Sequence, residues 1–87
     1  MMFMIHFEID PDHREKSTER LRTGGPGLPE NVKPVGIWHS VTLLEGWAIV
    51  ETDDANALAK HMHYWTDLNI NHITPVLSPE EVLAVSS

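Results

Sequence analysis

The first hydrophobic residues of the chain alternate with other residues in the manner of a β-strand. Across residues 2–9 the odd-numbered positions carry Phe or Ile, whereas the even-numbered positions carry Met, His and Glu. Successive side chains of a strand point to opposite faces of a sheet. The odd-numbered face is therefore predicted to lie in the core, and the other face has mixed polarity.

Three further segments show strand-like patterns. Residues 35–41 and 46–52 alternate and are separated by the short connection "TLLEG", which predicts a β-hairpin. Residues 70–77 form the last predicted strand. Pro75 lacks a backbone N–H, so this strand is expected at an edge of the sheet.

A first helix is predicted after the first strand. Asp10 is a suitable N-cap, Pro11 occupies the first helical position and Gly24 marks the stop. Leu21 is its only large aliphatic residue, so this helix is expected to cover the sheet loosely. The Pro- and Gly-rich residues 24–34 form a long loop.

The second helix has the clearest pattern. It is predicted within residues 52–68, capped by Thr52 or Asp53. Apolar residues recur with helical spacing and predict the buried stripe Ala55, Leu58, Ala59, Met62 and Trp65. In the tail, 78–87, Ser78 and Glu81 have capping-box spacing around Pro79, which predicts a short terminal helix.

The order of elements predicts an α+β fold in one domain spanning residues 1–87. Strand–helix–strand–strand–helix–strand is the ferredoxin-like βαββαβ arrangement, a four-stranded antiparallel sheet with two helices on one face. The uncovered face would expose apolar residues such as Met4. A second copy is the simplest cover, so we predict a homodimer whose sheets pair as a dimeric α/β barrel.

Composition narrows the classes of function. The chain has 6 Lys and Arg against 13 Asp and Glu, and most of the basic residues are interleaved with acids. Such a balance disfavours nucleic-acid binding. No apolar run reaches the roughly 18 residues of a membrane span, and no signal-peptide pattern is evident. We therefore expect a cytoplasmic protein without a nucleic-acid or membrane partner.

The histidines do not show the spacing of a metal site. His61 and His63 are two apart on the predicted helix, so their side chains diverge by about 200°. A zinc pair on a helix needs i,i+4 spacing, and the chain has no cysteine. A site built from three strands, with His6, His39 and His72, stays open. Neither a metal nor another cofactor is predicted.

The chain resembles a known family along nearly its whole length. The resemblance rests on "FMIHFEIDPDHREKSTER", "KPVGIWHSVTLLEGWAIVETDDANAL" and "WTDLNINHITPVLSPEE". These segments are similar to a family of short bacterial domains of unknown function. The residues that match its pattern are Gly36, Trp38, His39, Gly46, Glu51, Asp53, Trp65, Asp67, Pro75 and Val76. His6 departs from the pattern, so the resemblance implies no shared role for it.

The resemblance implies a fold more directly than an activity. The family is similar to dimeric α/β-barrel proteins, a superfamily that includes cofactor-independent monooxygenases of the antibiotic-biosynthesis type and small stress-response barrels. Binding of a small apolar or aromatic molecule is the function we expect. Cofactor-independent oxygenation is one alternative, and a structural or regulatory dimer without a ligand site is another.

Candidate site residues follow from residue type. His39 and His72 are candidate catalytic bases, because a histidine near a carboxylate can take up a proton near neutral pH. The candidate ligand-binding residues are Trp38, Trp47, Trp65, His6 and Glu51. Trp38 and His39 are adjacent in a strand, so only one of them can face any given pocket.

Overall fold

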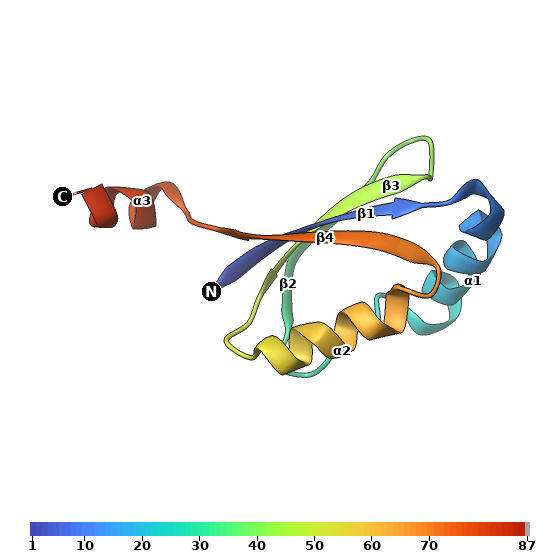
Figure 1. Ribbon diagram of the computed structural model, residues 1–87, viewed down its shortest axis with the longest axis horizontal. Helices are drawn as coiled ribbons and strands as arrows, with labels where there is room; N and C mark the ends of the chain where they lie inside the picture. The colour runs from blue at the N-terminus through green and yellow to red at the C-terminus, as the bar shows by residue number, and fades with distance from the viewer. Residues whose placement is uncertain (87) are drawn as a thin grey trace.

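Four antiparallel strands form one open sheet (Figure 1). The structure, a computed structural model, describes residues 1–86. The strands are β1 (Met2–Ile9), β2 (Lys33–His39), β3 (Glu45–Glu51) and β4 (Asn69–Val76), in the spatial order β2-β3-β1-β4. β4 lies at an edge, as Pro75 predicted, and pairs with β1 along its whole length.

The helices begin and end where local capping groups act. They are the 3₁₀ turn η1 (Pro11–His13), α1 (Arg14–Gly24), α2 (Ala55–Trp65) and α3 (Pro79–Ser86). The Asp10 carboxylate accepts a hydrogen bond from the Asp12 N–H at 2.8 Å, so Asp10 caps the turn η1 as predicted, whereas α1 itself begins at Arg14 without a side-chain cap. Gly25 ends α1 with a φ of 65°, a conformation that favours glycine.

The cap of α2 is Asp54, one residue after the predicted Asp53 and two after the predicted Thr52. The Asp54 carboxylate accepts hydrogen bonds from the N–H groups of Asn56 and Ala57, at 3.0 and 3.1 Å. Thr52, one of the two predicted caps, instead accepts a hydrogen bond from the Asp54 N–H through its hydroxyl. This bond fixes the turn that leads into α2. Asp54 therefore caps the helix, and Thr52 holds the residues just before it.

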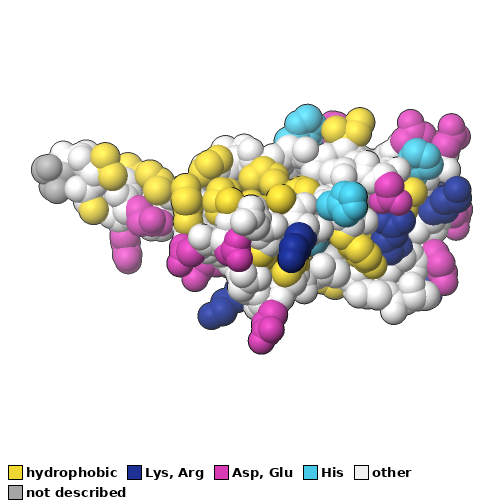
Figure 2. Space-filling model, turned by 60° about the horizontal axis from the view of Figure 1, so that its bottom comes forward, with side chains coloured by type: hydrophobic (Ala, Val, Ile, Leu, Met, Phe, Trp, Pro, Cys, Tyr) yellow, Lys and Arg dark blue, Asp and Glu magenta, His cyan; other side chains and the backbone are white. Residues whose placement is uncertain are grey.

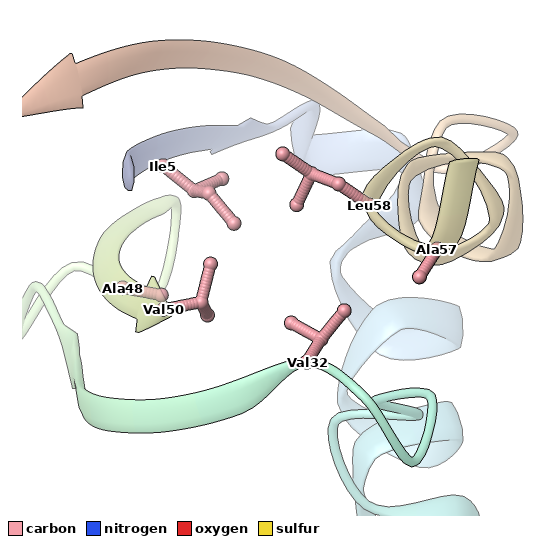
Figure 3. Packing of buried hydrophobic residues seen from close by; sticks show 6 residues of the cluster. All are labelled: Ile5, Val32, Ala48, Val50, Ala57 and Leu58. Atoms are coloured by element: carbon pink, nitrogen blue, oxygen red, sulfur yellow. The ribbon is translucent and has the colours of Figure 1, made fainter. Parts of the chain in front are cut away.

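The core lies between α2 and the helix-facing side of the sheet (Figure 3). Its centre is Ile5 of β1 and Val50 of β3, which are 2% and 0% exposed. The rest of this buried cluster is Val32, Ala48, Ala57 and Leu58. The alternation predicted for β1 and β3 is confirmed, because odd positions of β1 and even positions of β3 face this core.

The buried stripe of α2 differs from the predicted one. Ala55 and Ala59 are exposed, whereas Ala57 and His61 are buried with Leu58 and Trp65. The helix is therefore turned about its axis toward the side that carries His61. Alanines contribute little apolar area, so they do not decide which side of a helix turns inward.

Polar contacts, not apolar packing, hold α1 in place. Its only buried residue is Ser17. Arg20 donates to both carboxylate oxygens of Asp67, at 2.6 and 2.7 Å, and to the Tyr64 carbonyl at 2.6 Å. The His13 ring forms a hydrogen bond with the Leu68 carbonyl at 3.3 Å. α1 is thus fastened to the end of α2 and the start of β4 rather than pressed onto the sheet.

The architecture agrees with an α+β fold compatible with the ferredoxin-like arrangement. α3 stands away from the rest of the chain, at the far end of β4 (Figure 1), and the Cα positions extend over 48 × 26 × 17 Å. Its predicted capping box is confirmed, because Ser78 and Glu81 exchange side-chain-to-backbone hydrogen bonds of 3.0 and 3.1 Å. The pairing of two sheets into a barrel stays a prediction.

Replacing Ile5 by alanine is expected to lower the free energy of unfolding by about 3 kcal/mol, because the side chain is buried and its neighbours relax only partly into the space. Urea denaturation followed by circular dichroism measures the change. Val41→Ala is the matched control, since Val41 is 99% exposed and its truncation should alter stability by less than about 0.5 kcal/mol. Equal effects of the two substitutions would contradict this description of the core.

The contact between Arg20 and Asp67 should make stability depend on pH in the acid range. The hydrogen bond from Arg20 lowers the pKa of the Asp67 carboxyl below its ordinary 3.8. The stabilisation is therefore complete above pH 3.8 and is lost as the pH falls through the lowered pKa. Asp67→Asn should be less stable than wild type at pH 7, with a difference in melting temperature that shrinks toward pH 2.

Asp12→Asn, an exposed carboxylate in the turn before α1, is the control for this pH series. A difference between wild type and Asp67→Asn that stays constant down to pH 2 would contradict the assignment.

Candidate functional site

A cavity of about 580 Å³ lies between the helix-facing side of the sheet and helices α1 and α2. All four strands contribute to its wall, together with Pro26 from the loop after α1. Most of the wall is apolar, with Ile5, Phe7, Leu21, Ile37, Met62 and Trp65 among its side chains. Its size and character are those of a site for a small organic molecule.

The cavity has a buried end and an open end. Ile5, His61 and Trp65 are buried residues of its wall. Leu43 in the β2–β3 connection and His39 at the end of β2 are exposed residues of the same wall. The mouth is therefore on the β2 side of the molecule, and His39 lies at the mouth.

The cavity exists because α1 offers few side chains that could fill it. Ser17, Thr18 and Leu21 are the residues of α1 in its wall, and only Leu21 is large and apolar. The bonds from Arg20 hold the helix at its far side, over the end of α2. Since neither large side chains nor a shift of α1 close the gap, a space remains beneath the helix.

The loop after α1 forms one end of the wall and is tied to α2. The Trp65 indole N–H donates to the Pro26 carbonyl at 2.7 Å. Gly27 has a φ of 70°, and a Cβ there would lie 2.5 Å from the Tyr64 ring. Only glycine combines this backbone conformation with this close approach. The Gly- and Pro-rich sequence thus allows the loop to pack against the last turn of α2.

Three residues of the wall each hold a buried polar atom that has no hydrogen-bond partner among residues 1–86. The atoms are Nδ1 of His61, Oδ1 of Asn69 and Nδ2 of Asn71. A buried polar atom without a partner is unusual, and each one destabilises the fold by roughly 1–3 kcal/mol. Because all three residues line the same cavity, a single bound molecule could supply partners to them.

The His61 ring is the buried titratable group of the site. Burial lowers its pKa below the ordinary 6.5, and an interaction with the Gly27 backbone partly opposes this effect. The Nδ1 atom of the ring has no hydrogen-bond partner among the described residues. At pH 7 the ring is neutral, and with a proton on Nε2 it presents the lone pair of Nδ1.

His39 is held at the mouth by aromatic packing. Its ring meets the edge of Phe7 with the centroids 5.4 Å apart. The Phe7 ring in turn lies across Gly46 on β3, where a Cβ would come within 2.3 Å of it. The glycine therefore permits the position of Phe7, which supports His39.

The opposite face of the sheet carries a row of aromatic and histidine side chains. Trp38, Trp47, His6 and His72 are cross-strand neighbours on β2, β3, β1 and β4. His6 stacks on Trp47 with centroids 5.3 Å apart and on His72 with centroids 6.0 Å apart. We call these four residues the open-face row.

Carboxylates accompany the histidines of the open-face row. The His6 Nε2 lies 3.0 Å from a carboxylate oxygen of Glu45, and the His72 Nε2 lies 3.5 Å from one of Glu8. Both pairs are partly exposed to solvent. Exposed pairs of this kind contribute little to stability, so the row is a polar-edged aromatic surface.

The structure divides the predicted site residues between the two faces. The cavity wall contains His39 and Trp65. The opposite face carries the other five, namely the open-face row residues Trp38, Trp47, His6 and His72, and Glu51 at the end of β3. His39 and His72 are therefore on opposite sides of the sheet, and no one site can contain both.

The placement of the histidines on two faces also excludes a metal site built from His6, His39 and His72. His39 cannot share an ion with His6 and His72, because the sheet lies between them. Within residues 1–86, no three His, Cys, Asp or Glu side chains lie close enough together to hold a metal ion. The same residues include no helix with the length and apolarity needed to cross a membrane.

Sequence reasoning missed three polar residues of the cavity wall. The predicted stripe did not include His61, although it is three residues after Leu58 and four before Trp65. Asn69 and Asn71 alternate in phase with the half-buried Ile73 of β4. The sequence did contain a signal for these residues, because each is a polar residue at a position where the periodicity predicts a core residue.

Acid should destabilise the protein through His61. Between its lowered pKa and 6.5 the unfolded chain binds more protons than the folded chain, so stability falls as the pH decreases through this range. His61→Leu removes this effect, and its stability relative to wild type should rise between pH 7 and pH 5. Urea denaturation at each pH measures it.

Titration of the ring protons of His61 by NMR provides the direct check. A pKa at or above 6.5 would contradict the burial of this ring.

Comparison with known proteins identifies a family but no characterised relative. Neither the curated proteins nor the solved structures give a match. The family model described as Domain of unknown function (DUF3303) matches residues 1–87, which is the full length of the sequence. The match agrees with the resemblance to short domains of unknown function noted from the sequence. The chain is therefore a member of the DUF3303 family.

Proposed function

We propose that this protein binds a small, mostly apolar organic molecule in the cavity between the sheet and helices α1 and α2. One observation carries the proposal: a single apolar cavity is lined by three residues, His61, Asn69 and Asn71, each of which holds a buried polar atom without a hydrogen-bond partner. A filled core would have no reason to keep polar atoms without partners. A ligand with a hydrogen-bonding group at one end satisfies them.

The walls indicate the shape of the ligand. Phe7 and Trp65 offer aromatic surfaces, and Ile5, Ile37 and Met62 offer aliphatic ones. A flat ring system buries its faces well between such side chains. The chain carries a net charge of −7, which disfavours a strongly anionic ligand.

The polar end indicates the ligand's functional group. The Nδ1 of neutral His61 is an acceptor, and the two asparagine amides supply a donor and an acceptor. A hydroxyl group both donates and accepts, so it can bond to His61 and to an amide at the same time. A phenol combines this group with a flat apolar ring and fits the site best.

Catalysis is the second candidate function, and His61 is the observation that favours it. A neutral histidine with a free ring nitrogen in an apolar cavity is placed to take a proton from a bound phenol. His39 at the mouth could take part, whereas His72 lies on the other face. Removal of the proton would prepare the ring for oxygen in the cofactor-independent oxygenation that the resemblance implies.

We expect 2-naphthol to bind about tenfold more tightly than naphthalene, which corresponds to one additional hydrogen bond of about 1.4 kcal/mol. NMR titration of ¹⁵N-labelled protein measures both affinities through the three indole N–H signals. The Trp65 signal should shift, because Trp65 lines the cavity, and the Trp38 and Trp47 signals on the opposite face should not. Shifts of the latter two alone would place the site on the open face.

Variants of α2 test the role of His61. His61→Leu should abolish the preference for 2-naphthol while leaving the affinity for naphthalene nearly unchanged. His63→Leu is the matched control, because His63 is exposed on the same helix. If neither ligand shifts the Trp65 signal, the cavity is not a binding site and the chain is better described as a structural or regulatory module.

Measuring the consumption of dissolved oxygen distinguishes catalysis from binding alone. Consumption of oxygen in the presence of a bound phenol, without added metal or cofactor, would support the oxygenase alternative if His61→Gln abolishes it. Binding without oxygen consumption would leave the protein as a binding module.

A further inference from the structure

The cavity is larger than the simple phenol that its polar residues favour. Its volume of about 580 Å³ lies within the range of sites that hold drug-sized ligands. A phenol or naphthol with its hydroxyl near His61 is smaller than such ligands, so part of the apolar wall would have no atoms packed against it. A ligand that fills the cavity therefore has a second part beside its ring.

Three aliphatic side chains of the wall are exposed to solvent. Leu21 of α1, Ile37 of β2 and Leu43 of the β2–β3 connection are 36%, 37% and 54% exposed. An exposed side chain that also lines a cavity lies at its opening, so we call these three the mouth residues. Figure 2 shows another group of hydrophobic side chains at the end that carries α3, which Figure 1 places opposite α1 and the β2–β3 connection. The mouth residues are thus a separate apolar surface, continuous with the cavity.

Leu43 keeps its place at the mouth in spite of an unfavourable backbone conformation. Its φ is 64°, and among residues 1–86 it is the only non-glycine residue with a positive φ. This region favours glycine, asparagine and aspartate. Hydrogen bonds of the turn hold it, because the Leu43 N–H donates to the Ser40 carbonyl at 2.9 Å and the Leu44 N–H donates to the Thr42 hydroxyl at 3.3 Å. A leucine at such a position, with its side chain in the cavity wall, points to a role in the cavity.

The wall offers nothing to a charged group. Among the residues that the structure describes, no Lys, Arg, Asp or Glu belongs to it. A charged group drawn into the cavity would lose its hydration without gaining an ionic partner. The mouth residues are all aliphatic and come from three different elements, so a flexible, uncharged chain can follow them.

We propose that the ligand is a phenol that carries an uncharged aliphatic chain, with its hydroxyl toward His61 and its chain along the mouth residues. This inference rests on the proposed function and narrows the class of its ligand. Each methylene group that leaves water on binding raises the affinity about fourfold. Leu43 is then a specificity-determining residue that selects for the chain, whereas His61 selects for the hydroxyl group.

Two phenols that differ only in chain length test the inference. Isothermal titration calorimetry should show that 4-hexylphenol binds about thirtyfold more tightly than 4-ethylphenol, or more. The Trp65 indole signal should shift with both ligands, because both place the ring within the cavity. If 4-ethylphenol does not shift this signal, the proposed function fails and this inference with it. If 4-ethylphenol does shift it but 4-hexylphenol gains less than about threefold, this inference alone fails.

A variant of Leu43 tests the path of the chain. Asparagine tolerates the positive φ, so Leu43→Asn should leave the turn folded while removing the aliphatic side chain. We expect it to weaken binding of 4-hexylphenol about tenfold and to change binding of 4-ethylphenol by less than about twofold. Val41→Asn is the matched control, since Val41 belongs to the same connection but is 99% exposed and lies outside the wall.

Equal weakening of both phenols by Leu43→Asn, or no weakening of either, would overturn the inference. 1-Octanol supplies a hydroxyl group and a chain without a ring. Binding of 1-octanol as tight as that of 4-hexylphenol would show that the cavity selects for a chain alone, and it would overturn the assignment to a phenol.

Discussion

The contact between Arg20 and the end of α2 sets the spacing on which the rest of the structure depends. The guanidinium binds both oxygens of Asp67 and the Tyr64 carbonyl, and it lies 5.3 and 5.5 Å from the ring centroids of Tyr64 and Trp65. A planar guanidinium that forms several hydrogen bonds fixes both the position and the orientation of α1 relative to α2, whereas the single ammonium group of a lysine would not. This contact holds α1 over a cavity that the few apolar side chains of the helix do not fill.

Holding α1 away from the sheet leaves a cavity with polar atoms in its wall. Three unpartnered atoms at roughly 1–3 kcal/mol each are a large sum, since small domains have a total stability of about 5–15 kcal/mol. The tightly packed side chains of Ile5 and Val50 offset some of this destabilisation. A protein that tolerates such atoms gains from a ligand that satisfies them, because binding then also stabilises the fold.

The sheet separates two surfaces of different character. Its helix-facing side encloses a space with one buried, neutral histidine. Its open side carries stacked rings whose histidines stand beside carboxylates at the water boundary. The side chains that line the cavity are therefore separate from those of the open face. A shift of one strand's register by a single residue would move the side chains of that strand from one of these surfaces to the other.

The amino-acid sequence by itself determined the local structure. Alternation predicted the core face of β1, Asp10 and Ser78 predicted the caps of η1 and α3, and Pro75 predicted an edge strand, because each of these signals acts over a few residues. It also placed His39 and Trp65 among the candidates that line the cavity. The match to a family with no assigned function added no further site residue.

Only the tertiary structure decided which side of α2 turned inward, and with it the burial of His61. The rotation of α2 and the height of α1 depend on contacts between residues far apart in the chain, such as Arg20 with Asp67, which are 47 positions apart. The periodicity of hydrophobic residues does not predict contacts between residues so far apart in the chain. The existence of the cavity and the division of the histidines between two faces are consequences of these long-range contacts, so they became visible only once the chain was folded.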